Sequence, residues 1–303
     1  SLAPADSPWD LGLKRIAAEW STISKGSVTL KIYPGGIVGD EMDMIRKMRI
    51  GQLNAAGLTG IGLCRILPTI LNIQAPMLIR TDEQLACVLD SLRPVFEKGL
   101  EEKGFVVLSW QMVGWVHFFS KMPIVTPADL KKQKLFVWAG DADAVQIWKE
   151  MGFHPVPLAV TDLMSSLQSG MVDCYSATSL SSASYQWFGL AKNMCGMNWA
   201  PLIGGLVVSS NSWSKIPADL RPKLLESAQK ISAQMQNEIR AKDAEALSIM
   251  KQNGLTVTSV SPQDEAAWKS VVDSGIPKLY GKSFDKAIFE AITGYLQGSC
   301  KGK

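Results

Sequence analysis

Residues 126–138, TPADLKKQKLFVW, contain a helix start, a turn and a strand within thirteen residues. Thr126 is a favourable N-cap, Pro127 has the fixed φ preferred in a first helical turn, and Asp129 places negative charge near the positive helix end. The run LFVW at 135–138 is apolar and rich in residues that favour strands. The stretch therefore predicts a short helix followed by a strand that is buried on both faces.

Patterns typical of helices and strands alternate along the rest of the chain. Helices are predicted near 8–23, 41–50, 81–103, 145–148, 161–169, 217–253, Trp268 and Phe289, and strands near 28–33, 52–56, 105–110, 116–120, Val156, 171–175, 205–209 and 255–260. This alternation predicts an α/β fold with largely parallel sheets covered by helices. The helix from 217 to 253 would be about 54 Å long, so we expect it to lie across two domains. Pro222 is expected to kink or restart its first turn.

Composition favours a globular chain of two domains. The 303 residues are long for a single core, and 47% of them are hydrophobic against 19% charged. A net charge of +3 and a pI near 8.5 argue against nucleic-acid binding, so we interpret the lysines at 131, 132 and 134 as a solvated turn. The sequence has no run of 18 apolar residues that would span a membrane.

The opening stretch and the segment after it resemble the solute-binding proteins of tripartite ATP-independent periplasmic (TRAP) transporters. That family has a "P-DL-G-KIRV" turn and strand, followed by a helix that ends in "lGa-PV". The matching residues here are Pro127, Asp129, Leu130, Lys134, Leu135, Val137, Met151, Gly152, Pro155 and Val156. The segment YPGGIVGDE at 33–41 similarly resembles "YP-GqlGdE". The resemblance extends from Pro4 to about Val272.

The resemblance implies a two-lobed periplasmic binding protein fold with mixed, mostly parallel sheets, hinge strands and a long helix that braces both lobes. It predicts residues 1–113 and 202–241 as lobe I, and residues 114–201 and 242–303 as lobe II. It also implies that the irregular region from Gly57 to Pro76 lines the ligand cleft.

The chain departs from the family at the positions that would hold a carboxylate. The family's strand arginine, which forms a two-pronged salt bridge with the substrate, corresponds to Phe136. A second arginine corresponds to Val116, and an asparagine corresponds to about Ala177. Each hydrogen bond to a charged group contributes about 1.5–3 kcal/mol, so we expect a small anion to bind poorly.

Ten residues are predicted to form the wall of an apolar cleft. These candidates are Trp9, Thr59, Trp110, Met112, Trp115, Val116, Phe136, Trp138, Ala177 and Trp199. For Trp110 and Trp199 an ordinary core position is the favoured interpretation, whereas the family alignment places Phe136 and Val116 at the ligand.

The sequence therefore predicts a periplasmic solute-binding protein that captures a neutral or hydrophobic, lipid-like ligand and delivers it to the membrane permease of a TRAP transporter. Family members without the arginine are associated with a tetratricopeptide-repeat lipoprotein, which is the second expected partner. One alternative is a small carboxylate ligand held by another cation, such as Arg65, Arg80 or Lys121. Another is a scaffold without a ligand that docks a repeat protein. We expect export, with the signal and a lipidated anchor removed from the N-terminus.

No enzymatic, cofactor or metal site is predicted. His117 and His154 have no ligand partner at the spacing of a metal site, and no P-loop, dinucleotide fingerprint or nucleophile elbow occurs. Cys174 with His154 is a weak candidate for a nucleophile and its base. The cysteines at 64, 87, 174, 195 and 300 are widely spaced, and we interpret each as a small buried hydrophobe. Export would allow one or two disulfides, whose pairing the sequence leaves open.

Overall fold

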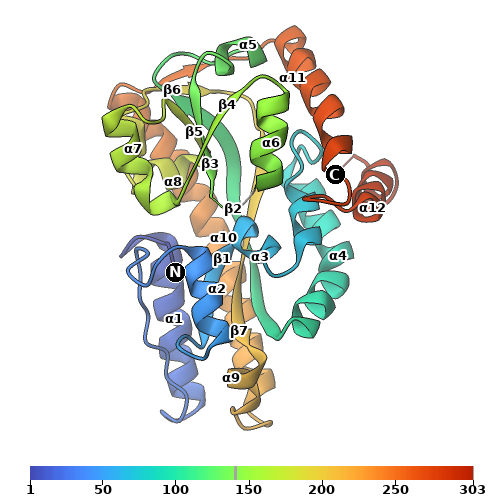
Figure 1. Ribbon diagram of the computed structural model, residues 1–303. Helices are drawn as coiled ribbons and strands as arrows, with labels where there is room; N and C mark the ends of the chain where they lie inside the picture. Colours follow the sequence, from blue (N-terminus) through green and yellow to red (C-terminus); the bar gives the residue numbers. More distant parts are fainter. Residues whose placement is uncertain (140–141, 303) are drawn as a thin grey trace. The chain divides into compact units, whose positions relative to one another are not determined.

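A computed structural model describes residues 1–139 and 142–302, without the side chains of 142–144 (Figure 1). The chain divides into two compact units. Unit 1 comprises Ser1–Ile70, Ser91–Val113 and Ile203–Lys242, and unit 2 comprises Leu71–Asp90, Gly114–Leu202 and Asp243–Lys303. The division differs from the predicted lobes chiefly at residues 71–90, which pack with unit 2.

Unit 1 is built around a sheet of strands β1, β7 and β2. Its elements are α1 (Pro8–Ile23), α2 (Glu41–Arg49), β1 (Ala55–Thr59), α3 (Gly60–Cys64), the second half of α4 (Asp82–Glu102), the first part of β2 (Phe105–Ser120), most of β7 (Ala200–Ser209), α9 (Ser210–Ser214) and the first two thirds of α10 (Arg221–Gln252). Strand β1 pairs antiparallel with β7, from Ala55 opposite Val208 to Thr59 opposite Gly204. Strand β7 then lies between β1 and β2.

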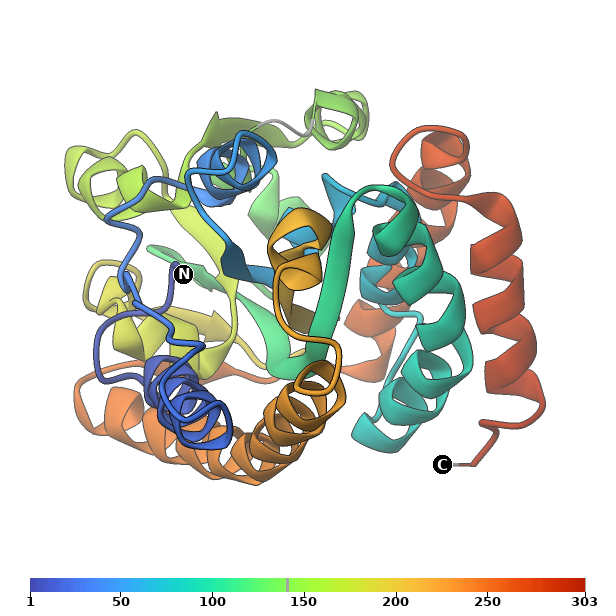
Figure 2. The ribbon, with the colours of Figure 1, turned by 90° about the horizontal axis from the view of Figure 1, so that it is seen from below.

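Helix α1 packs along α10 within unit 1 (Figure 2). The helix begins after its N-cap Ser7, because the backbone N–H of Asp10 donates to the Ser7 hydroxyl at 3.4 Å. The buried indole of Trp20 donates to the carbonyl of Leu224 at 2.9 Å. A Cβ atom on Gly12 would lie only 2.0 Å from the sulfur of Met235, so glycine permits this close approach of the two helices.

The strand predicted at 28–33 is wrong, because residues 29–34 have no strand pairing. Val28 and Leu30 still pack against the core around Trp20 and Leu224. Alternating hydrophobicity determines which side chains turn inward, but a strand also needs a neighbouring backbone to pair with.

Unit 2 contains a mixed sheet. Its strands are the second part of β2, β3 (Lys134–Trp138), β4 (His154–Leu158), β5 (Cys174–Ala177), β6 (Asn193–Cys195) and β8 (Thr256–Thr258). Strand β3 pairs in parallel with β4 and β5, and β6 pairs in parallel with β8. Strand β2 pairs antiparallel with β5 and β6. The parallel pairing that we predicted thus holds around β3, and β2 adds antiparallel pairs.

The other elements of unit 2 are α-helices and short 3-10 helices. They are η1 (Pro68–Gln74), which begins in unit 1, the start of α4 (Asp82–Glu102), α5 (Pro127–Leu130), α6 (Ala142–Glu150), η2 (Val160–Asp162), α7 (Leu163–Ser169), α8 (Ser179–Ser184), η3 (Trp187–Gly189), the end of α10, α11 (Pro262–Gly275), η4 (Ile276–Leu279) and α12 (Lys286–Gln297). The long helix predicted from 217 is confirmed as α10, with Pro222 in its first turn.

The stretch at 126–138 folds as predicted. Helix α5 begins after Thr126, whose backbone N–H donates to the carboxylate of Asp129 at 2.9 Å. Strand β3 follows, and its neighbours Leu135 and Phe136 pack into two different core clusters. Because adjacent strand residues point to opposite faces, this packing confirms that β3 is buried on both faces.

A disulfide and several hydrogen bonds explain why residues 71–90 belong to unit 2. Cys87 in α4 is bonded to Cys300, which follows α12. The amide of Asn72 donates to the carbonyl of Asp285 at 2.7 Å. Cys64, Cys174 and Cys195 are buried thiols, as we expected of all five cysteines, but the other two form this bridge.

Candidate functional site

Phe136 lies in an apolar core of unit 2. Its side chain is only 7% exposed and packs in a cluster that includes Phe119, Tyr175 and Ala177. The rings of Phe119 and Tyr175 stack at 5.3 Å in the same cluster. A cation at position 136 would have to be buried among these side chains, where an unpaired charge is strongly destabilising.

The three positions implied by the family do not share one environment. Ala177 lies opposite His117 in the β2–β5 ladder and packs in the same cluster as Phe136. Val116 packs against the other cluster, which includes Phe118 and Trp199. The structure therefore brings Phe136 and Ala177 together and places Val116 in a different apolar cluster.

Trp199 is part of an aromatic core. Its ring lies 5.0 Å from that of Phe118 and 5.5 Å from that of Trp268, and its backbone N–H donates to the carbonyl of Val116 at 2.8 Å. Trp115 is half-buried, and its indole donates to the carboxylate of Asp82 at 2.8 Å. Trp138 ends strand β3 and is half-buried.

The predicted ligand-contact residues in unit 1 differ in the hydrogen bonds that their polar atoms make. The indole of Trp110 donates to Glu97 at 3.0 Å, and the backbone N–H of Met112 donates to the side chain of Gln236 at 3.0 Å. Trp9, in the first turn of α1, has a buried indole N–H without a hydrogen-bond partner among the described residues. It is thus a donor that a ligand could satisfy.

Thr59 is held by a buried carboxylate that the sequence did not reveal. Glu41 is 2% exposed and accepts from the backbone N–H of Thr59 at 2.5 Å and from its hydroxyl at 2.9 Å. A Cβ on Gly62 would lie 2.6 Å from this carboxylate. Burial raises the pKa of Glu41 to about 7, against the hydrogen bonds from Thr59, which lower it. Glu41 shares a helical face with Met44, Ile45 and Met48, which was the available signal.

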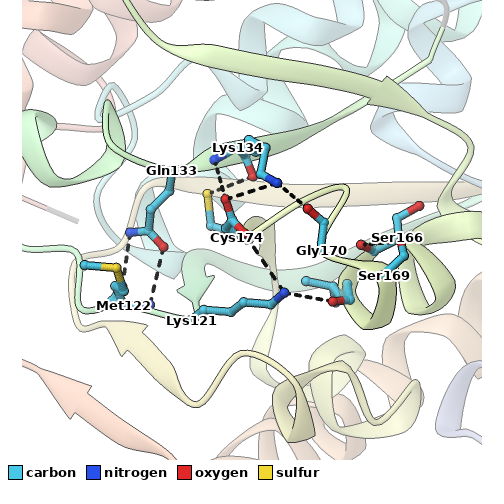
Figure 3. Close-up of polar contacts among 10 residues, drawn as sticks. Lys121, Met122, Gln133, Lys134, Ser166, Ser169, Gly170 and Cys174 are labelled. Atoms are coloured by element: carbon cyan, nitrogen blue, oxygen red, sulfur yellow. Dashed lines mark hydrogen bonds and ion pairs between the residues drawn. The ribbon is translucent and has the colours of Figure 1, made fainter.

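Two lysines of unit 2 donate hydrogen bonds to backbone carbonyls at the carboxyl end of α7 (Figure 3). The ammonium of Lys121 donates to the carbonyl of Leu167 at 2.9 Å, and that of Lys134 donates to the carbonyl of Gly170. The carboxylate of Asp173 lies 4.0 Å from Lys121 and 3.9 Å from Lys134. These lysines neutralise the negative end of a helix.

The other candidate cations lie elsewhere. Arg80 is ion-paired with Glu265. Arg65 follows α3, and its backbone N–H donates to the carbonyl of Gly62. Arg80 and Lys121 thus already have partners that a ligand carboxylate would have to displace.

Comparison with protein families gives a match over residues 1–283. The matching family is DctP, described as bacterial extracellular solute-binding protein, family 7. The chain belongs to this family. At the family level, its members are solute-binding components of transport systems rather than enzymes.

Relatives of this DctP-family chain are distant. The sialic acid-binding periplasmic protein SiaP of Vibrio cholerae is 23% identical over 294 residues, which cover 93% of this chain and 86% of that protein. A solute-binding protein of Chromohalobacter salexigens is 27% identical over 175 residues, covering 57% of this chain. That alignment spans 52% of the relative, about half its length.

Solved structures of TRAP periplasmic solute-binding proteins share the fold. One from Chromohalobacter salexigens with bound D-glucuronate has a TM-score of 0.89 at 21% identity and covers 99% of this chain and 98% of that one. One from Sulfurospirillum deleyianum with bound succinate has a TM-score of 0.88 at 21% identity, covering 98% and 96%. The DctP-family chain therefore has the two-lobed α/β periplasmic binding fold, with a mixed sheet and a long helix.

Cys174, the weak candidate for a nucleophile in this DctP-family chain, is poorly suited to catalysis. Cys174 is fully buried, and its thiol donates to the carbonyl of Lys134 at 3.5 Å. Burial raises the pKa of Cys174, which disfavours the reactive thiolate.

Within residues 1–139 and 142–302, no group of three His, Cys, Asp or Glu side chains could hold a metal ion. No helix in the same ranges is long and apolar enough to cross a membrane.

Proposed function

We propose that this chain is the solute-binding component of a TRAP transporter and that its ligand is neutral or hydrophobic. The observation that carries the ligand class is the burial of Phe136, at the position of the family's arginine, in an apolar cluster with Ala177. Val116, at the second arginine position, is also surrounded by apolar side chains. The ligand-contacting residues in this proposal are the ten predicted from the sequence.

A comparison of binding free energies favours an apolar ligand for the predicted cleft residues. A bidentate arginine contributes two charge-assisted hydrogen bonds of about 1.5–3 kcal/mol each, and none of the three positions supplies one here. Burial of about ten methylene groups contributes about 8 kcal/mol before ordering costs, which corresponds to roughly micromolar affinity. A lipid-like chain could bind without any charged contact.

The relatives support the other ligand class. Their names and titles include sialic acid, 2,3-diketo-L-gulonate, D-glucuronate and succinate, all of which are carboxylic acids. For this chain to bind such a ligand, a cation other than the family arginine would have to hold the carboxylate. Lys121 and Arg80 would first have to leave the partners that they have in the structure.

The proposal includes the partners and location that the resemblance implies. The protein would act in the periplasm and deliver its ligand to the permease subunits. A tetratricopeptide-repeat lipoprotein and an N-terminal membrane anchor remain predictions of the resemblance alone. Co-purification of the chain with its neighbours from membranes tests the repeat-protein partner. A ligand site filled by the protein's own side chains in a crystal would instead support the ligand-free scaffold.

Titration of the purified protein with carboxylates tests the ligand class. We expect D-glucuronate and succinate to bind more weakly than millimolar, and Phe136→Leu to leave this result unchanged. Phe136→Arg buries a cation, so its folding must be verified by thermal melting before its binding is measured. Micromolar binding of either acid to the unmodified protein would contradict the proposal and favour the carboxylate alternative.

A further inference from the structure

A small pocket lies within unit 2, apart from the residues considered above. It has a volume of about 150 Å³ and opens between residues 76–78, the end of α11 with η4, and helix α12. Its wall is mainly apolar, formed by Pro76, Met77, Leu78, Val272, Ile276, Pro277, Tyr280 and Phe289. The remaining lining residues are Lys269 and Asp273.

Covalent and aromatic contacts hold the α12 side of the pocket. The rings of Tyr280 and Phe289 meet edge to face at 5.7 Å. The disulfide between Cys87 and Cys300 ties the end of α12 to α4. The backbone N–H of Cys300 also donates to the carbonyl of Tyr295 in the last turn of α12, at 2.8 Å. The pocket wall that carries Phe289 is therefore fixed to the rest of unit 2.

Met77 fixes the opposite side of the pocket. Its backbone has φ of +58°, a left-handed conformation that residues with side chains rarely adopt. Its N–H donates to the carbonyl of Trp199 at 2.8 Å, and its side chain packs against the aromatic core that contains Trp199. This unusual turn is thus held in place by a core, as strained residues at binding sites commonly are.

The mouth of the pocket carries no net charge from its lining residues. The ammonium of Lys269 lies 2.7 and 2.8 Å from the two carboxylate oxygens of Asp273, and both side chains are mostly exposed. Each charge is satisfied by the other, so the mouth favours a neutral ligand over an anion or a cation.

We propose that this pocket binds one neutral apolar group the size of a single aromatic ring or a short alkyl chain. A dry cavity of about 150 Å³ lined by Leu, Ile and Phe is large enough for benzene or xenon. The pocket here has a similar volume and a mainly apolar wall, although it also carries Lys269 and Asp273 and is partly open to solvent. This inference does not depend on the ligand proposed for the region around Phe136.

Xenon and benzene are suitable probes. We expect crystals pressurised with xenon to show a xenon atom between Ile276 and Phe289. We also expect benzene to shift the methyl resonances of Leu78, Val272 and Ile276 in solution. Absence of xenon from the pocket together with unchanged methyl resonances would overturn the proposal.

Matched variants test whether the apolar wall of the pocket is responsible for benzene binding. Val272→Phe should fill the pocket and weaken benzene binding at least tenfold, with Leu78→Phe as a second variant if the first does not fold. Lys269→Ala removes a charge at the mouth but leaves the wall intact, so it should bind benzene as the unmodified protein does. Equal binding by the filled variants would show that the probe binds elsewhere and would contradict the proposal.

Discussion

At the scale of single residues, Glu41 is the most informative side chain of unit 1. Its carboxyl group is buried, and its pKa is raised from 4.5 to about 7 because desolvation outweighs the hydrogen bonds from Thr59. Because folding favours the protonated form of Glu41, its contribution to the free energy of unfolding is fully present below pH 4.5. That contribution is lost as the pH rises to about 7, since the unfolded chain has already released the proton.

Glu41→Gln should therefore change how stability depends on pH. From pH 4 to pH 8, the free energy of unfolding of the variant should rise by on the order of 3 kcal/mol relative to that of the unmodified protein. The reason is that the neutral amide removes the cost of burying a charge. Urea unfolding at both pH values measures this difference.

Asp43→Asn is the matched control for Glu41→Gln. Asp43 lies close by on the same helix, has a side chain that is 45% exposed, and pairs with Arg46, which lowers the pKa of Asp43. Its stabilising contribution is lost only as the pH falls below its ordinary range, so the Asn variant should keep a constant offset from pH 5 to pH 8. If Glu41→Gln also shows a constant offset, the buried carboxyl does not titrate as described.

Single residues also show what sequence reasoning can supply. The pattern around Phe136 located a strand buried on both faces, because a short continuous apolar run of strand-forming residues is typical of such a strand. Glu41 has the helical spacing of the buried residues Met44, Ile45 and Met48, a signal that could have indicated an inward side chain but led to no prediction. Its contact with Thr59 was not predictable, since that contact joins α2 to a later strand and depends on tertiary packing.

At the scale of elements, the end of helix α7 depends on two lysines. Lys121 and Lys134 donate to its terminal carbonyls and lie near Asp173 (Figure 3). Replacing both with Met should lower the free energy of unfolding by about 1–2 kcal/mol, because favourable interactions with the helix dipole and carbonyls are lost. Chemical denaturation measures the change, which should shrink at high salt.

Lys132→Met serves as the control for the lysine pair. Its side chain is 67% exposed, and its ammonium lies 3.5 Å from the carboxylate of Asp129. The expected change is within about 0.5 kcal/mol. A double variant at Lys121 and Lys134 as stable as this control would mean that the lysines do not stabilise α7.

Strand β2 depends on a glycine near its middle. The strand runs unbroken from Phe105 to Ser120, whereas the sequence predicted two strands with a gap between them. Gly114 has φ of +144° and lets the strand continue, and its missing Cβ would lie 3.1 Å from Thr178. The sequence could not show this continuity, because glycine is equally compatible with a break.

Gly114→Ala should lower the free energy of unfolding by about 1–3 kcal/mol, because a side chain strains this backbone conformation and crowds Thr178. Thermal or urea unfolding measures the loss. Gly189→Ala is the control, since a Cβ there meets no atom within 4 Å. Equal stability of the two variants would refute the role given to Gly114.

The register of β2 also limited the prediction of the site. Val116 and His117 are adjacent, so their side chains leave opposite faces of the strand. His117 pairs with Ala177, and Val116 packs in the cluster of Phe118. The family alignment gave these positions without the local packing that separates them.

At the scale of the whole molecule, one disulfide links distant parts of the chain. Cys87 and Cys300 are 213 residues apart, and both belong to unit 2. Replacing both with Ser should cost about 2–5 kcal/mol, because the unfolded chain gains conformational freedom. Melting with and without a reductant measures the loss, and the reductant should not affect the double variant. An unchanged melting temperature in both cases would show that the bridge contributes nothing.

The class of the whole fold could be predicted from local patterns in the sequence, whereas its long-range pairings could not. The alternation of helices and strands and the long helix α10 indicated the α/β class and two domains. Placement of residues 71–90 in unit 2 depends on contacts with residues beyond 260, including the disulfide, and the spacing of five cysteines gives no pairing. Long-range contacts of this kind leave no local periodicity in the sequence.

The most direct test of the central claim is extraction of the purified protein with organic solvent, followed by mass spectrometry of the released molecules. Phe136→Arg, verified as folded, is the parallel sample, and Phe136→Leu is the apolar control. We expect a lipid-like molecule from the unmodified protein and the Leu variant, and its loss from the Arg variant. Release of a small organic acid, with no apolar molecule, would contradict it.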